Sequence, residues 1–314
     1  MEYVILAVSL AGIVFGADIL VAGAVSIARK FKVSDFVIGA AIVGVGTSMP
    51  ELVVSFIGAL NGNADVAIGN VVGSNIFNVL GILGLTALFF PVATDRKNMR
   101  FELPLCIFVS VLLLLLTFNC FNGSASSLAR LDGILLLLVF ALYMLYSFAR
   151  DRKEAAVAAD NGDGGSLWKA VLKVVGGLAL LITSCDFFVD NAVSVAKSFG
   201  VDNAFISLTL IACGTSLPEL AASVAAAIKK NTDMALGNIV GSNIFNITLI
   251  LGLSSQVMPL TSSGITYIDY IVMIAATVLL FVIGLFGRIG RLSGLLMFIC
   301  FVLYNWYLVS NQMG

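Results

Sequence analysis

Two polar motifs recur in an otherwise apolar chain, and both recur at the same separation. The sequence reads GTSMPEL at residues 46–52 and GTSLPEL at 214–220, then GNVVGSNIFNV at 69–79 and GNIVGSNIFNI at 237–247. Both pairs are separated by 168 residues, so the chain contains one long internal duplication. Each copy places a glutamate, several hydroxyl groups and several asparagines inside apolar stretches.

The apolar stretches are long enough to cross a lipid bilayer. Hydrophobic residues make up 60% of the chain, charged residues 11%, and the mean hydropathy is +1.08, values too apolar for a soluble domain. Because a spanning helix needs about 20 apolar residues, we predict an all-α polytopic membrane protein with ten transmembrane helices. The first stretch lacks a basic leader and is interpreted as a helix, not a signal peptide. The predicted spans are 3–28, 33–59, 66–89, 101–119, 128–149, 168–196, 201–228, 234–258, 267–287 and 291–310.

The distribution of basic residues predicts how the chain is inserted. If the N-terminus lies outside, all but Arg130 and Lys197 of the 17 lysines and arginines fall on the inner side. The polar segment 150–167 is then a cytoplasmic linker between a first repeat, 1–149, and a second repeat, 168–314. Both termini face outward. Five helices is an odd number, so the second repeat is inverted relative to the first, as in many secondary transporters.

Each GTSxPEL motif predicts a broken helix that carries polar groups on one face. Pro50 and Pro218 lack an amide hydrogen and interrupt the helix, and irregular backbone at membrane depth needs protein, water or an ion to satisfy it. Side chains four residues apart share a helix face. Four such sets occur: Thr47, Glu51 and Ser55; Thr215, Glu219 and Ser223; Asn70, Ser74 and Asn78; Asn238, Ser242 and Asn246.

These groups are the hard oxygen donors that sodium, calcium and magnesium prefer. An ionisable side chain costs about 2.5–3.5 kcal/mol at a helix centre, so Glu51 and Glu219 predict an intramembrane cation site that one calcium ion would neutralise. The chain contains no histidine, which excludes histidine-dependent catalysis, and its five cysteines lack C-x-x-C spacing, so neither a zinc site nor a disulfide framework is supported. The net charge of −1 gives no basis for nucleic-acid binding, and we expect no cofactor and no enzymatic activity.

Several duplicated residues have two interpretations. Small residues let transmembrane helices pack closely, so Ser48 and Ser216 could serve packing or ligation. Asp18 and Asp186 could form interhelical hydrogen bonds or line an ion path. Packing is the favoured interpretation for the remaining motif residues, Gly69, Gly73, Asn75, Gly237, Gly241 and Asn243.

The doubled motifs resemble the paired alpha-repeats of the calcium/cation antiporter superfamily, in its prokaryotic sodium/calcium exchanger branch. The resemblance covers all ten predicted spans. It implies that Glu51 and Glu219 ligate calcium. The further cation ligands that it implies are the side chains of Thr47, Ser48, Ser74, Asn78, Thr215, Ser216, Ser242 and Asn246, with the main-chain carbonyls of Gly44 and Ala212.

The resemblance also implies a function. The chain would exchange sodium for calcium across the cell inner (plasma) membrane by alternating access, with the long first and sixth helices moving against the motif helices. Potassium-dependent relatives carry aspartate where this chain has Asn246, so we expect exchange without potassium. More than two sodium ions per calcium would make turnover electrogenic. The partners would be calcium, sodium and the lipid bilayer.

Three other functions are open to a polytopic membrane protein with these residues. A proton/calcium antiporter would use the same two glutamates as proton carriers, and it remains the main alternative. A channel is disfavoured by the broken-helix site. An intramembrane protease is disfavoured because the chain has no histidine, no G-x-G-D and no G-x-S-x-G.

Overall fold

Helices account for almost all of the backbone that the structure describes. The computed structural model describes residues 2–31, 33–94, 96–118, 127–155, 166–198, 212–261 and 264–313. Within these residues, eight helices are long and apolar enough to cross a membrane, or up to nine if a bent helix pair counts as one span. This confirms the all-helical membrane fold. The count of ten remains a prediction, because residues 201–211, the first part of the predicted span 201–228, lie outside the described residues.

The helices of the first half follow the predicted spans closely. They are α1 (Glu2–Phe31), α2 (Asp35–Ile38), the π-helix η1 (Gly39–Gly44), α3 (Val45–Thr47), α4 (Met49–Leu60), α5 (Ala64–Ile76), the π-helix η2 (Phe77–Leu83), α6 (Gly84–Phe89), α7 (Arg96–Thr117) and α8 (Arg130–Ala155). Helix α8 continues beyond the predicted end at residue 149, because arginine, lysine, glutamate and alanine all favour helix.

The described helices of the second half follow in the same order as their counterparts in the first. It contains α9 (Leu167–Ser198), α11 (Ala212–Gly214), α12 (Leu217–Ile228), α13 (Thr232–Phe245), the π-helix η4 (Asn246–Ile250), α14 (Leu251–Val257), α15 (Tyr267–Gly284) and α16 (Arg291–Met313). Each GSN motif lies at the end of a helix, α5 or α13, that continues directly into a π-helix. Such π-helical turns are frequent at functional sites because they shift main-chain hydrogen bonds out of the α pattern.

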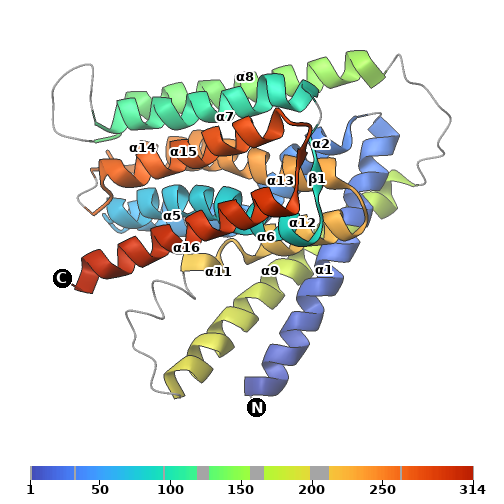
Figure 1. Cartoon of the computed structure of the whole chain (residues 1–314), viewed down its shortest axis with the longest axis horizontal. Helices are drawn as coiled ribbons and strands as arrows, with labels where there is room; N and C mark the ends of the chain where they lie inside the picture. The colour runs from blue at the N-terminus through green and yellow to red at the C-terminus, as the bar shows by residue number, and fades with distance from the viewer. Residues whose placement is uncertain are drawn as a thin grey trace.

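Helices α1 and α9, the two longest in the described part of the chain, pack against each other. Glycines bring their backbones close together: a Cβ at Gly16 would lie 2.7 Å from Leu181 N, and one at Gly177 would lie 2.6 Å from Leu20 N. In Figure 1 this pair crosses obliquely beside the other helices, with the N-terminus at the free end of α1. Helices α1 and α9 therefore form a closely packed pair, which also packs against the motif helix α12.

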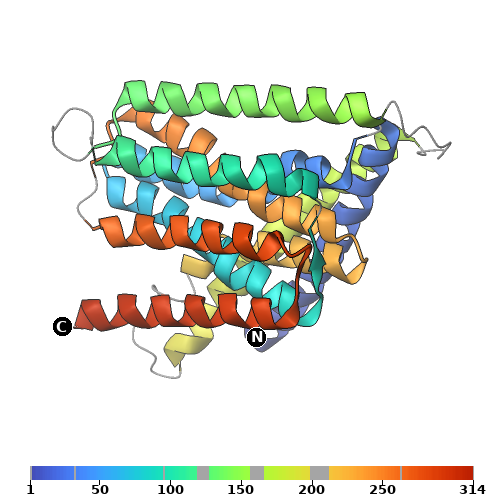
Figure 2. The ribbon, with the colours of Figure 1, turned by 45° about the horizontal axis from the view of Figure 1, so that its top comes forward.

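The helices that carry the asparagine motifs occupy the centre of the molecule. Of the most apolar 18-residue stretch of Thr232–Val257, 94% is buried inside the protein. The corresponding share for Arg291–Ser310 of α16 is 11%. Helices α7, α8, α15 and α16 lie in layers on one side of this centre (Figures 1 and 2). The polar motifs are therefore enclosed by apolar helices.

Both GTSxPEL motifs interrupt their helices, as predicted. Helix α3 ends at Thr47, Ser48 leaves the helical conformation with φ −80° and ψ 10°, and α4 begins at Met49 with Pro50 in its first turn. The two parts of this span are bent by 48°. Ser216 occupies the equivalent position in the second half, with φ −93° and ψ 9°. Each break thus places a motif glutamate in the first turn of a new helix.

Two short strands were not predicted from the sequence. Strand β1 (Val92–Ala93) pairs antiparallel with β2 (Arg288–Ile289), and this pairing joins the loop after α6 to the loop between α15 and α16. Strands of two residues are too short to give an alternating hydrophobic pattern. Their hydrogen bonds satisfy main-chain groups beyond the helix ends.

Candidate cation-binding site

Two fully buried glutamates, one from each half, face the opposite GTSxPEL motif. Glu51 lies in the first turn of α4 and Glu219 in the first turn of α12, and both are 0% exposed. Ser216 Oγ donates a hydrogen bond to Glu51 Oε1, and Ser48 Oγ donates one to Glu219 Oε1, each at 2.8 Å. The helix N-terminus favours the negative charge of each carboxylate. The serines left open between packing and ligation therefore hold the glutamates across the two halves.

An asparagine from the neighbouring helix donates hydrogen bonds to the helix turn that carries each glutamate. Asn70 Nδ2 donates to the main-chain carbonyl of Glu51 at 3.1 Å and to Ser55 Oγ at 2.9 Å. These bonds tie α5 to α4 within the first half. The second half repeats both bonds: Asn238 Nδ2 donates to Glu219 O at 3.2 Å and to Ser223 Oγ at 2.9 Å.

The motif threonines extend the network across the two halves. Thr47 Oγ1 lies 3.3 Å from Asn238 Oδ1, and Thr215 Oγ1 lies 3.5 Å from Asn70 Oδ1. Thr47 is fully buried, whereas Thr215 is partly exposed. The two contacts therefore join equivalent residues of the two halves, but the Thr215 side chain is more exposed than that of Thr47.

A second set of amides links the ends of α5 and α13 and the π-helices that follow them. Asn75 Nδ2 donates to the carbonyl of Asn243, and Asn243 Nδ2 donates to the carbonyl of Asn75, both at 3.2 Å. Asn78 Nδ2 donates to Asn243 Oδ1, and Asn246 Nδ2 donates to Asn75 Oδ1, both at 3.0 Å. Packing was the favoured sequence interpretation for Asn75 and Asn243. Their duplicated amide groups were the signal that could have indicated these reciprocal bonds.

Four buried oxygens in this network have no hydrogen-bond partner among the described residues. They are Glu51 Oε2, Glu219 Oε2, Asn78 Oδ1 and Asn246 Oδ1. A buried acceptor without a partner is unfavourable, and a buried charge without a counter-ion is more so. All four atoms are acceptors and two carry formal negative charge, so this arrangement suits a cation.

The remaining predicted ligands lie around the same groups. Ser74 Oγ is 3.2 Å from Ser216 Oγ, and Ser242 Oγ donates to the carbonyl of Gly44 at 3.3 Å. Ala212 is the first residue of α11, directly after a segment outside the described residues. In the described part of the chain, no group of three or more histidine, cysteine, aspartate or glutamate residues could hold a metal. Any cation bound here would therefore depend on neutral oxygens as well as on the two carboxylates.

The duplicated aspartates outside the motifs have different surroundings. Asp18 Oδ1 lies 2.7 Å from Lys229 Nζ, which also donates to the carbonyl of Asp18 at 2.8 Å. This interhelical ion pair joins α1 to the C-terminal cap of α12. Asp186, in contrast, is exposed and lines a cavity of about 520 Å³ together with Asp190 and Thr215. The interhelical interpretation is confirmed for Asp18, while the ion-path interpretation stays open for Asp186.

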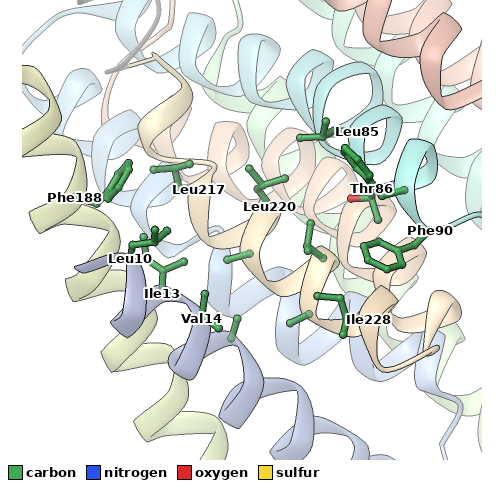
Figure 3. Close-up of a pocket in the computed structure, with 15 residues that line it drawn as sticks. Leu10, Ile13, Val14, Leu85, Thr86, Phe90, Phe188, Leu217, Leu220 and Ile228 are labelled. Carbon is green, nitrogen blue, oxygen red and sulfur yellow. The ribbon is translucent and has the colours of Figure 1, made fainter. Parts of the chain in front are cut away.

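A second cavity, of about 430 Å³, lies between α1, α6, α9 and α12. Figure 3 shows side chains such as Ile13, Leu220 and Phe90 pointing into it. Of its lining residues, only Thr86 carries a side-chain oxygen. Apolar walls offer no ligands to a cation, so this cavity is not a candidate part of the cation site.

Comparison with known proteins gives one consistent family. The family model described as "Sodium/calcium exchanger protein" matches residues 1–149 and 169–310. The putative antiporter CaxA of Alkalimonas amylolytica is 38% identical over 97% of this chain and 97% of its own length. The inner membrane protein YrbG of Escherichia coli is 36% identical over 88% of this chain and 86% of its own length. A solved structure of the sodium-calcium exchanger NCX_Mj superposes with a TM-score of 0.85 and 28% identity, covering 98% of both chains.

Proposed function

The chain belongs to the sodium/calcium exchanger protein family, and we propose that it moves calcium out of the cytoplasm in exchange for sodium. The coarser function, cation antiport by a multi-pass membrane protein, follows from the family and from the apolar helices. The choice of sodium as the coupling ion, the direction of transport and the ligands are our proposal.

One observation carries this proposal: two fully buried glutamates, each held by the other half, present oxygens without partners in the described residues. The carboxylates of Glu51 and Glu219 supply two negative charges, which match one calcium ion. The surrounding ligands would be neutral oxygens, a set that also suits sodium. We propose as neutral ligands Thr47, Ser48, Ser74, Asn78, Thr215, Ser216, Ser242 and Asn246, with the carbonyls of Gly44 and Ala212.

Alternating access would follow from movement of α1 and α9 against the motif helices. These two helices are the longest in the described chain, pack against each other and carry none of the proposed ligands. The cavity lined by Asp186, Asp190 and Thr215 lies between α9 and the motif helices, and it would provide one route to the site. The reciprocal bonds between equivalent groups of the two halves support two inverted five-helix repeats with the site between them. Both termini would then face outward and residues 150–167 would be cytoplasmic.

The charge of the site supports electrogenic, potassium-independent exchange. Two carboxylates neutralise one calcium ion or two sodium ions. If three sodium ions were exchanged for one calcium ion, each cycle would move one net positive charge across the membrane. Each elementary charge moved across 100 mV contributes about 2.3 kcal/mol, so the membrane potential would help to drive calcium export. Asn78 and Asn246 contribute no charge, and a site with two carboxylates lacks the further acid expected for holding potassium together with calcium.

Calcium flux into proteoliposomes tests this function directly. Vesicles loaded with sodium chloride, potassium chloride or an acidic buffer are diluted into calcium-45, and uptake is measured for each internal cation. We expect uptake from sodium-loaded vesicles only, and faster uptake when the interior is made positive. Uptake driven by the acidic interior without sodium would favour the proton/calcium alternative, in which the same glutamates carry protons.

The cell inner (plasma) membrane is the proposed location. The similar protein YrbG is named an inner membrane protein, and the exposed surfaces of the outer helices are rich in large apolar side chains that suit a lipid bilayer. Fractionation of cells that express the tagged chain, with separation of membranes by density, measures this location.

A further inference from the structure

Asn75 and Asn243 are outside the set of proposed ligands, yet their amide orientations are determined by the main chain. Both are 1% exposed. The NH2 group of each faces the main-chain carbonyl of the other at 3.2 Å. Because a carbonyl accepts hydrogen bonds and never donates them, the nitrogen of each amide must lie on that side. The Oδ1 atom of each amide must therefore point in the other direction.

These two oxygens in turn determine the orientation of a second pair of amides. Asn75 Oδ1 accepts from Asn246 Nδ2, and Asn243 Oδ1 accepts from Asn78 Nδ2, each at 3.0 Å. Since an acceptor faces each of them, Asn78 and Asn246 must present their NH2 groups to it. Their own Oδ1 atoms are then turned away, and these are two of the four buried oxygens without a partner among the described residues.

We propose that Asn75 and Asn243 are positioning residues that hold the Oδ1 atoms of Asn78 and Asn246 toward the transported cation. We call this pair, Asn75 and Asn243, the asparagine clamp. The inference rests on the proposed function and assigns these two residues a role in it. Without the clamp, the amides of Asn78 and Asn246 could also present their NH2 groups, whose positive ends repel a cation.

The clamp also restricts the charge of the site. A carboxylate at position 246 would place an oxygen against Asn75 Oδ1, with no proton to share between the two acceptors. To present its NH2 group there instead, the Asn75 amide would have to turn over and lose its bond to the carbonyl of Asn243. The same holds for position 78 and the Oδ1 atom of Asn243. The clamp therefore favours neutral amides at both positions and keeps two negative charges in the site.

A double-mutant cycle tests whether each clamp residue acts through its amide partner. Calcium affinity is measured by calorimetric titration of the purified full chain with calcium chloride, and KM and kcat by calcium-45 uptake. Asn243→Ala and Asn78→Ala should each weaken calcium binding about 3- to 10-fold, with KM raised more than kcat is lowered. The double variant should be no weaker than either single variant. In contrast, Asn75→Ala combined with Asn78→Ala should multiply the two effects, because these residues belong to different pairs.

Thr248→Val is the matched control. Thr248 is fully buried in the same π-helix as Asn246, and its hydroxyl donates only to Ile244 O, at 2.6 Å, in the hydrogen bonds of the described residues. Its replacement should leave calcium affinity unchanged. If the alanine variants do not fold, as judged by gel filtration in detergent, the same cycle is run with serine.

Two results would overturn the clamp: effects that multiply for Asn243→Ala with Asn78→Ala, or an unchanged calcium affinity in Asn243→Ala. Failure of the proposed function gives a different pattern. In that case the wild-type protein binds calcium but does not exchange it for sodium, and the titration cycle still measures the clamp. A wild-type chain that binds neither calcium nor sodium overturns both inferences.

Discussion

Replacement of one motif glutamate by glutamine removes half of the negative charge proposed to hold calcium. Glu51 is fully buried, and Ser216 already bonds to its Oε1 atom, so Oε2 is the oxygen left for the ion. Unit charges 4 Å apart attract by about 4 kcal/mol at an effective dielectric constant of 20, and a divalent ion doubles this value to about 8 kcal/mol. Desolvation offsets part of this attraction, and a net loss of about 4 kcal/mol corresponds to roughly 10³-fold weaker calcium binding.

We therefore expect Glu51→Gln and Glu219→Gln each to abolish calcium exchange while the protein stays folded. Calcium-45 uptake measures exchange, and thermal unfolding in detergent with and without calcium chloride measures binding. Calcium should raise the Tm of the wild-type protein but of neither variant. Glu102→Gln is the control, because Glu102 is also a buried acid, 4% exposed, but lies in α7, which carries no motif residue. Exchange near the wild-type rate in either motif variant would refute the two-carboxylate site.

Three further predictions concern coupling, topology and the contact of α1 with α12. Replacing potassium by choline should leave sodium-driven calcium uptake unchanged, whereas an absolute need for potassium would show that Asn246 has been misinterpreted. Trp168 and Tyr267 are both exposed at helix starts. A cysteine introduced at Trp168 should react with an impermeant thiol reagent from the cytoplasmic face, and one introduced at Tyr267 should react from the outer face. The reverse labelling would contradict the inverted repeats. Lys229→Gln removes a partly exposed ion pair with Asp18 and should lower the free energy of unfolding by at most about 1 kcal/mol. A double variant that exchanges the two charges should restore this stability. A larger loss that the exchange does not restore would mean that Lys229 acts through packing.

Much of the fold was predictable because membrane helices have a strong local signal. Ten apolar stretches of sufficient length, a single polar interruption and one duplicated pair of motifs predicted an all-helical membrane protein before any contact was known. The helix breaks at Ser48 and Ser216 were also predicted, because the proline two residues later removes a main-chain donor. The strands β1 and β2 were not predicted, since two residues carry no periodic pattern.

The sequence by itself determined which residue types could bind a cation and that the two halves supply equivalent sets. Only the tertiary structure decided which group bonds to which. The Ser48 hydroxyl donates to Glu219, and Asn75 orients Asn246, 171 residues away in each case, because a hydrogen bond depends on the distance and direction of two atoms in space. Asp18 and Asp186, equivalent in sequence, likewise differ because Lys229 lies next to only one of them among the described residues, and its position follows from the packing of α1 on α12.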